Sequence, residues 1–316
     1  MPRQSPTSPK TIERALELLG QQLKLTGPAS IEEVFSLADN PKHRQRDSTA
    51  RIPGAHVANG LTQESSKNWS GPYVRAREGE SFVLVEGTWK VPTPFLPPDA
   101  TAGNNTEYVC STWIGLDGHD QASLSLPQIG TVQSVCASQP EKFATGAWWQ
   151  WWVRGSKHNR PIFISPDRLP VKPGDMVYCR VKVISFGVDG ATPAEIELCI
   201  KNKSSGESLA FNVLARTPLV DGVTAEWIVE RQTKVGSDDL LPFANFGSVR
   251  FEGCTVHVKE QATGYVQKQQ LRGAKLIRMT DWTNFDQLGR TISSAVLEED
   301  NGSAAQVFFV GHSQDG

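Results

Sequence analysis

The sequence predicts an all-β sandwich of antiparallel sheets that follows a short helical N-terminal segment. From Asn68 onward, short apolar runs with a period of two are separated by clusters of Pro, Gly, Asn and Asp, which is typical of strands joined by turns. Before that point the apolar residues recur at helical spacing. We therefore expect residues 1–67 to be a helical segment with a basic linker, a candidate prosegment, and residues 68–316 to be one β-sandwich domain.

The N-terminal segment contains two amphipathic patterns. Residues 11–25 carry an apolar stripe on one helical face, formed by Ile12, Ala15, Leu16, Leu19 and Leu23. Ser30 and Glu33 have the spacing of a capping box, which predicts a second short helix over residues 31–38. Residues 41–67 are polar, basic at their start and punctuated by Gly and Pro, so we expect a linker there.

The β region repeats one pattern of short strand-like runs. Clear examples are residues 81–91, 176–186, 194–200, 249–258 and 306–311. Turns are expected at Pro173-Gly174-Asp175 and at Asp300-Asn301-Gly302, because Gly and Asn tolerate positive φ. Short strands without intervening helices favour a sandwich over a βαβ fold.

The bulk composition excludes several classes of partner. The 316 residues carry a formal net charge of -2 and a pI near 6.3, which gives no field that favours nucleic acid or an anionic membrane surface. No stretch approaches the ~20 apolar residues of a membrane span. No export signal is visible, so the sequence leaves the compartment unknown. We expect a monomer.

Common catalytic and metal-binding motifs are missing from the sequence. It contains no GxSxG elbow, HExxH motif, Walker loop or dinucleotide fingerprint. The five cysteines lack the spacing of zinc ligands, and most of them are expected to be buried thiols. His119-Asp120, in a Gly-rich loop, is expected to be solvated polar surface. The sequence therefore predicts no metal and no organic cofactor.

The segment AWWQWW, residues 147–152, holds four of the nine tryptophans. As a strand it directs Trp148, Gln150 and Trp152 to one face and Trp149 and Trp151 to the other. Both faces could be core, since aromatic side chains dominate buried surfaces. In the functional alternative, the face with the glutamine is the wall of a groove that holds an extended glycan or peptide.

A second unusual strand is TAEWIVERQ, residues 224–232, in which Glu226, Ile228 and Glu230 share one face. Acidic residues are depleted from strands, so this face is either a solvated outer surface or part of a site. A glycosidase pair is opposed by the spacing, because four residues along a strand lie about 13 Å apart. The carboxylates of glycosidases are about 5 to 9.5 Å apart.

The β region resembles the glutamic peptidases, the eqolisins, in seven short motifs that occur in the order of that family. The motifs are Asn68-Trp69-Ser70-Gly71, Gly87-Thr88-Trp89-Lys90-Val91-Pro92, Trp113-Ile114-Gly115-Leu116-Asp117-Gly118, Leu126-Pro127-Gln128-Ile129-Gly130, Trp148-Trp149-Gln150-Trp151, Ala225-Glu226-Trp227-Ile228-Val229-Glu230 and Pro242-Phe243-Ala244-Asn245-Phe246-Gly247. The resemblance implies a concanavalin-like sandwich of two antiparallel sheets, with a substrate groove across the concave sheet.

The resemblance also implies a catalytic dyad of Gln128 and Glu230. Glu230 is expected to take a proton from the attacking water and return it to the leaving amine, and Gln128 to stabilise the oxyanion. The expected substrate is a polypeptide, cleaved at acidic pH without a cofactor. The expected substrate-binding residues are Trp69, Trp113, Asp117, Trp148, Gln150 and Trp152.

Three features depart from the family pattern. Gln150 stands where the family carries a glutamate, a cysteine that often forms a disulfide is missing, and no export signal accompanies a family that is typically secreted. The alternative function is a lectin-like or peptide-binding sandwich without catalysis, including a degenerate peptidase, because fold alone does not define function. The presence of both Gln128 and Glu230 in matching motifs favours the enzyme.

Overall fold

The structure is a computed structural model that describes residues 29–30, 63–101, 103–120, 123–154, 156, 159–188, 191–215, 219–233, 239–281, 290–298 and 302–311. The two expected helices, at residues 11–25 and 31–38, lie outside the described residues. Between them, Ala29–Ser30 form strand β1. Every regular element within the described ranges is a β-strand, which confirms the expected all-β class.

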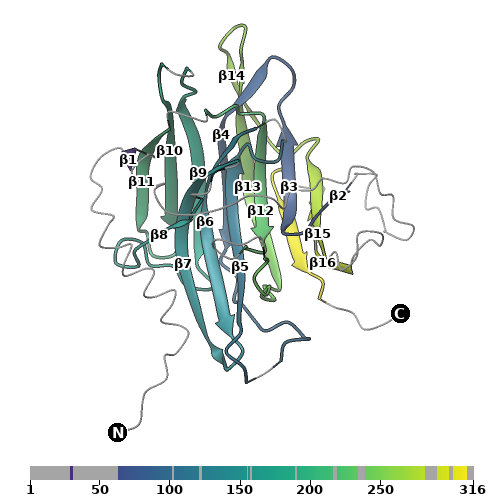
Figure 1. Cartoon of the computed structure of the whole chain (residues 1–316). Helices are drawn as coiled ribbons and strands as arrows, with labels where there is room; N and C mark the ends of the chain where they lie inside the picture. The colour runs from purple at the N-terminus through teal and green to yellow at the C-terminus, as the bar shows by residue number, and fades with distance from the viewer. Residues whose placement is uncertain are drawn as a thin grey trace.

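One layer of the sandwich, here the front layer, carries the tryptophan and carboxylate strands. Its strands pair antiparallel in the order β8 (Ile162–Ile164), β7 (Gln139–Val153), β6 (Ser125–Cys136), β5 (Glu107–Leu116), β12 (Thr224–Glu230), β3 (Trp69–Arg75), β15 (Lys275–Asp281) and β16 (Arg290–Leu297). Figure 1 shows β7, β6, β5, β12, β3 and β15 running side by side across the molecule.

The back layer pairs in the order β17 (Ala305–Phe309), β13 (Ser248–Glu260), β4 (Glu80–Lys90), β9 (Met176–Ser185), β10 (Ala194–Asn202) and β11 (Ser208–Ala215). Strand β16 pairs with β17, so the hydrogen bonding continues from one layer into the other. At the edges, β14 (Val266–Gln269) pairs with β13, and β1 pairs in parallel with β11.

The core lies between the two layers, where β5 packs over β4 and β9, and β12 packs over β4 and β13. Trp149, Trp151 and Trp227 of the front layer belong to this interlayer cluster. Trp148 belongs to a second cluster, together with Trp69, on the other side of the front layer. The expected alternation along residues 147–152 is therefore confirmed, and only one of the two tryptophan faces belongs to the interlayer core.

The cysteines are free thiols, as expected. Four of them, Cys110, Cys136, Cys179 and Cys254, are buried and Cys199 is partly exposed. Burial raises the pKa of the Cys110 thiol to about 12. A thiol with so high a pKa carries almost no thiolate at neutral pH, so Cys110 is part of the packing and is not a nucleophile.

The first strand of the front layer begins before Asn68. Residues 63–66, at the end of the expected linker, form β2 (Gln63–Ser66), which pairs in parallel with β15. Arg278, which is buried, donates from its Nε to Ser65 Oγ at 3.1 Å. These bonds make β2 part of the sandwich.

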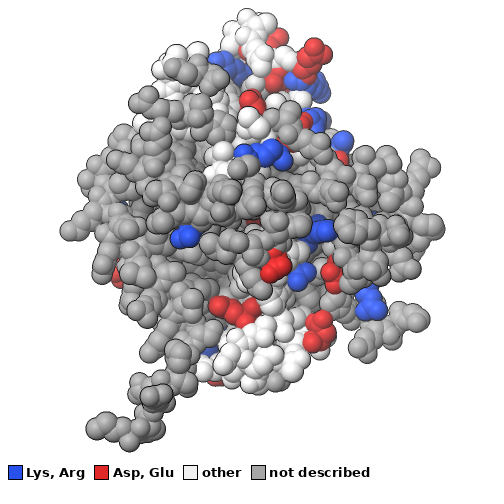
Figure 2. Space-filling model, in the orientation of Figure 1, with Lys and Arg blue, Asp and Glu red and all other residues white. Residues whose placement is uncertain are grey.

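The described surface carries charges of both signs. Figure 2 shows Lys and Arg interspersed with Asp and Glu among the described residues. Ion pairs such as Arg180–Glu197 and Arg250–Glu298 neutralise part of this charge locally. Within the described ranges, no helix is long and apolar enough to cross a membrane.

Candidate active site

Five adjacent strands of the front layer direct seven of the expected site residues to one face. Directly opposed residues of an antiparallel ladder point to the same side. Glu230 on β12 lies opposite Trp69 on β3, and Gln128 on β6 lies opposite Gln150 on β7. We define the site face by Trp69, Trp113, Gln128, Trp148, Gln150, Trp152 and Glu230.

Three side-chain N–H groups hold the carboxylate of Glu230. Asn68 Nδ2 and Trp69 Nε1 donate to Oε1 at 3.1 and 2.9 Å, and Trp113 Nε1 donates to Oε2 at 2.8 Å. The Trp69 and Trp113 rings pack edge to face, with centroids 4.9 Å apart. The two indoles therefore brace each other while they orient one carboxylate from neighbouring strands.

Gln128 is almost fully buried, with 4% of its surface exposed. Its Nε2 donates to Gln150 Oε1 at 3.1 Å, so one of its two N–H bonds is used within the protein. Gln128 and Glu230 lie on β6 and β12, with β5 between them. Each member of the expected dyad is therefore oriented by its own hydrogen-bond partners, Gln128 by Gln150 and Glu230 by the three N–H donors described above.

Gly130 lies between two tryptophans of the site face, Trp113 and Trp148. Gly130 on β6 lies directly opposite Trp113 on one side and Trp148 on the other. A Cβ at Gly130 would lie 2.2 Å from the backbone oxygen of Thr112 and 2.5 Å from Trp113 Cβ. Only glycine fits this close approach, which brings β5 and β6 together beneath the indoles.

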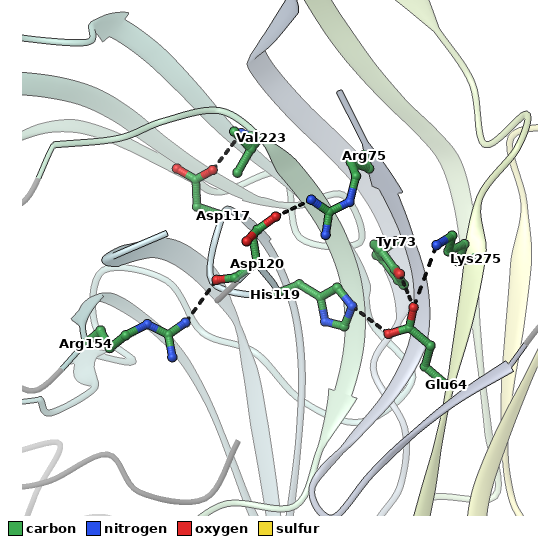
Figure 3. Close-up of polar contacts among 9 residues, drawn as sticks. All are labelled: Glu64, Tyr73, Arg75, Asp117, His119, Asp120, Arg154, Val223 and Lys275. Atoms are coloured by element: carbon green, nitrogen blue, oxygen red, sulfur yellow. Dashed lines mark hydrogen bonds and ion pairs between the residues drawn. The ribbon is translucent and has the colours of Figure 1, made fainter. Parts of the chain in front are cut away.

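Asp117 directly follows β5, and its side chain binds backbone N–H groups. Its carboxylate accepts bonds from the N–H groups of Asp221, Gly222 and Val223, at 2.8, 3.0 and 2.7 Å. Figure 3 shows the bond from Val223. These residues precede β12, so Asp117 fixes the entry of the strand that carries Glu230. It adopts φ 67, and its complete burial raises its pKa to about 6.

The loop after Asp117 is tied to three other parts of the front layer (Figure 3). His119 Nε2 lies 3.0 Å from Glu64 Oε2 on β2, and the Asp120 carboxylate pairs with Arg75 on β3. Arg154, just after β7, donates to the Asp120 backbone oxygen at 3.0 Å. The interpretation of His119 as solvated surface is wrong, because its side chain is 11% exposed.

Glu64 is held by more than one donor. Tyr73 Oη donates to Glu64 Oε1 at 2.5 Å, and Lys275 Nζ lies 3.9 Å from the same oxygen. The hydrogen bond with His119 contributes most to a lowering of the Glu64 pKa to about 2. Since the His119 ring also lies 6.4 Å from the Trp69 ring, this cluster supports the site face from its β3 side.

The sequence did not predict the positions that Asn68 and Glu226 have in the structure. Asn68 was noted as part of a motif, but its bond to Glu230 depends on the turn between β2 and β3. Glu226 is completely buried on the same side of β12 as Glu230, so the interpretation of a solvated outer face is wrong. The even spacing of the two glutamates was the only sequence signal for this.

Comparison with known proteins identifies the family. The model of the Peptidase A4 family matches residues 67–302. The fold is similar to scytalido-glutamic peptidase with a transition state analog inhibitor, with TM-score 0.56 and 19% identity over 77% of this chain and 98% of that chain. It is also similar to SCP-B, a member of the eqolisin family of peptidases in a complex with the tripeptide Ala-Ile-His, with TM-score 0.54 and 18% identity over the same shares. No curated protein matches the sequence.

These structural likenesses are distant in sequence and show a shared fold. The family match covers most of the chain and includes the strands of both layers. It confirms the resemblance found in the sequence motifs, and it places the described site within the matched residues. The chain belongs to the Peptidase A4 family, the glutamic peptidases or eqolisins.

Proposed function

We propose that this peptidase cleaves polypeptides at internal bonds by a Glu230/Gln128 dyad, with activity favoured at acidic pH. The observation that carries the proposal is the holding of Glu230 by Asn68, Trp69 and Trp113. N–H donors stabilise a carboxylate in its ionised form, which is the form that a general base needs.

Gln128 supplies the complementary group. One N–H of its carboxamide is bonded to Gln150, which orients the amide and directs the second N–H away from Gln150. We assign this second N–H to the oxyanion that forms when water attacks the scissile carbonyl. The proton on Glu230 then passes to the leaving amine as the carbon–nitrogen bond breaks, which returns the carboxylate to its starting state.

The test compares matched substitutions on one strand. Glu230→Gln removes the base, and Glu226→Gln makes the same change four residues earlier on the same side of β12. Digestion of denatured globin at acidic pH should stop with Glu230→Gln. Gln128→Ala should slow it by about a hundredfold, equivalent to about 3 kcal/mol of transition-state stabilisation.

Binding separates this role from loss of the fold. The Glu230→Gln and Gln128→Ala variants should still bind the peptide products of the digestion, and their thermal unfolding should resemble that of the parent protein. Near-normal turnover by Glu230→Gln, or loss of turnover only in Glu226→Gln, would contradict the assignment. Peptide or glycan binding without cleavage by the parent protein would favour the non-catalytic sandwich.

A further inference from the structure

Several buried polar atoms on the site face have no hydrogen-bond partner among the described residues. They include the Oγ of Ser111, which lies opposite Glu230, together with Gln128 Oε1 and Trp148 Nε1. Most buried polar groups in proteins are hydrogen-bonded, and each exception calls for an explanation. These atoms belong to the proposed dyad or to residues beside it, so a polar ligand that lies across the face would satisfy them.

Trp148 Nε1 and Gln128 Oε1 differ from the unpaired polar atoms of the interlayer core, because they belong to the site face. Trp151 Nε1 is also buried without a partner, but Trp151 faces the interlayer core, where no substrate can pass. Trp148 is 2% exposed and Gln128 is 4% exposed, and both belong to the face that carries Glu230. Trp148 Nε1 is a hydrogen-bond donor, and Gln128 Oε1 is an acceptor.

The two residues lie near enough to each other for one extended main chain to pass both. Trp148 is the diagonal neighbour of Gln128 across β6 and β7, because Gln128 lies opposite Gln150. Such diagonal neighbours have Cα atoms about 7 to 8 Å apart. An extended peptide presents its N–H and C=O groups on one edge every second residue, or about every 6.6 Å.

We propose that Trp148 Nε1 donates to a backbone carbonyl of the substrate while Gln128 Oε1 accepts from a backbone N–H, so that the enzyme recognises an extended main chain beside the scissile bond. The inference rests on the proposed function and extends it, since it assigns a second task to Gln128 and a specific hydrogen bond to Trp148. Recognition of the main chain gives tolerance of side chains at that position and excludes proline, which has no N–H.

The protein-side experiment measures binding in the Glu230→Gln background, where a peptide is not consumed. The probe is a capped heptapeptide from globin that the parent protein cleaves. Trp148→Phe keeps an aromatic ring but removes the N–H, and should weaken binding about five- to tenfold, as expected for one hydrogen bond. Trp151→Phe is the matched control, with the same substitution on the same strand, and should leave binding unchanged.

The substrate-side experiment begins with the parent protein, so its first measurement does not depend on the folding of a variant. Single N-methyl groups are introduced along the heptapeptide outside the scissile bond. One position should lose about tenfold in binding or cleavage, and Gln128→Ala should remove that discrimination.

The inference fails if Trp148→Phe binds like its parent, or if every N-methyl group outside the scissile bond is tolerated. Those results would leave the dyad intact. Turnover by Glu230→Gln would instead overturn the proposed function, so the two failures are distinguishable.

Discussion

At the scale of single residues, the amide of Gln150 occupies a position where the resemblance to the eqolisins implies a carboxyl. A carboxamide can donate a hydrogen bond through its NH₂ at any pH, but in the structure the Gln150 oxygen accepts a bond from Gln128. An ionised carboxylate can accept the same bond. The difference between the two side chains is therefore mainly one of charge.

Gln150→Glu should consequently move the alkaline limb of kcat/KM to lower pH. As the introduced carboxyl ionises, its charge opposes the oxyanion at Gln128 and couples to the titration of Glu230. Gln150→Met is the control, because it removes the acceptor without adding a charge and should lower the whole profile without shifting that limb. Superimposable profiles of the parent and Gln150→Glu would show that Gln150 only fills space.

Asp117 should make the fold less stable as the pH rises through the mildly acidic range. Its pKa is about 6 in the folded protein and near 3.8 when unfolded, so the folded state binds more protons between these values. The free energy of unfolding should fall between pH 4 and pH 6, by at most about 3 kcal/mol. Asp117→Asn should flatten this dependence in thermal unfolding. An unchanged slope would contradict the assignment.

At the scale of elements, β2 should protect the fold in acid through Glu64. The Glu64 pKa is lowered from 4.5 to about 2, so its stabilising contribution is complete above pH 4.5 and is lost as the pH falls toward 2. Glu64→Gln should move acid unfolding, followed by circular dichroism, to higher pH. Glu298→Gln is a surface control, because its partner Arg250 is 44% exposed and solvent screens the pair. Equal shifts in both variants would contradict a special role for β2.

Because β2 belongs to the sandwich, the chain can be shortened from its N-terminus only as far as the start of β2 without loss of stability. A chain that starts at Asn68 lacks Glu64 and the strand that pairs with β15, whereas a chain that starts at Leu61 keeps both. The shorter chain should unfold at lower temperature and lose activity, because Asn68 and Trp69, which hold Glu230, follow β2 directly. Equal activity and stability of the two chains would show that β2 is dispensable.

The sequence predicted those parts of the site that follow from periodicity. Alternation correctly separated Trp148 from Trp149 because a strand has a fixed period of two. It could not show that Glu226 is buried, since burial depends on strands far away in the sequence. His119 was misjudged for the same reason, because its partner Glu64 lies 55 residues earlier in a stretch of linker-like composition.

At the scale of the whole molecule, the sandwich places a site made from distant segments on one rigid sheet. Glu230 and Trp69 are 161 residues apart in sequence, yet they lie opposite each other on paired strands. The back layer contributes no site residue to this face. It supports the other side of the same strands through the interlayer core, so substitutions such as Trp227→Ala would damage the site indirectly, through packing.

The accessibility of the site leads to the last prediction, which concerns residues 1–67. Trp113, Gln128 and Trp148 are each at most 4% exposed in the full chain, so the access of a polypeptide to them is restricted. We propose that the segment before β2 is a removable prosegment. Its basic stretch, residues 42–51, would pair with carboxylates near neutral pH and be released as they protonate in acid.

Incubation at acidic pH should therefore shorten the chain, with activity rising in step. Mass spectrometry should find the new N-terminus before Gln63, since β2 belongs to the sandwich. Addition of Glu230→Gln protein to a small amount of parent protein distinguishes self-processing within one molecule from cleavage between molecules. A chain that starts at Leu61 should be active without the lag. The prosegment role fails if acid never trims the full chain and the shortened chain is no more active, in which case these residues are a permanent part of the enzyme.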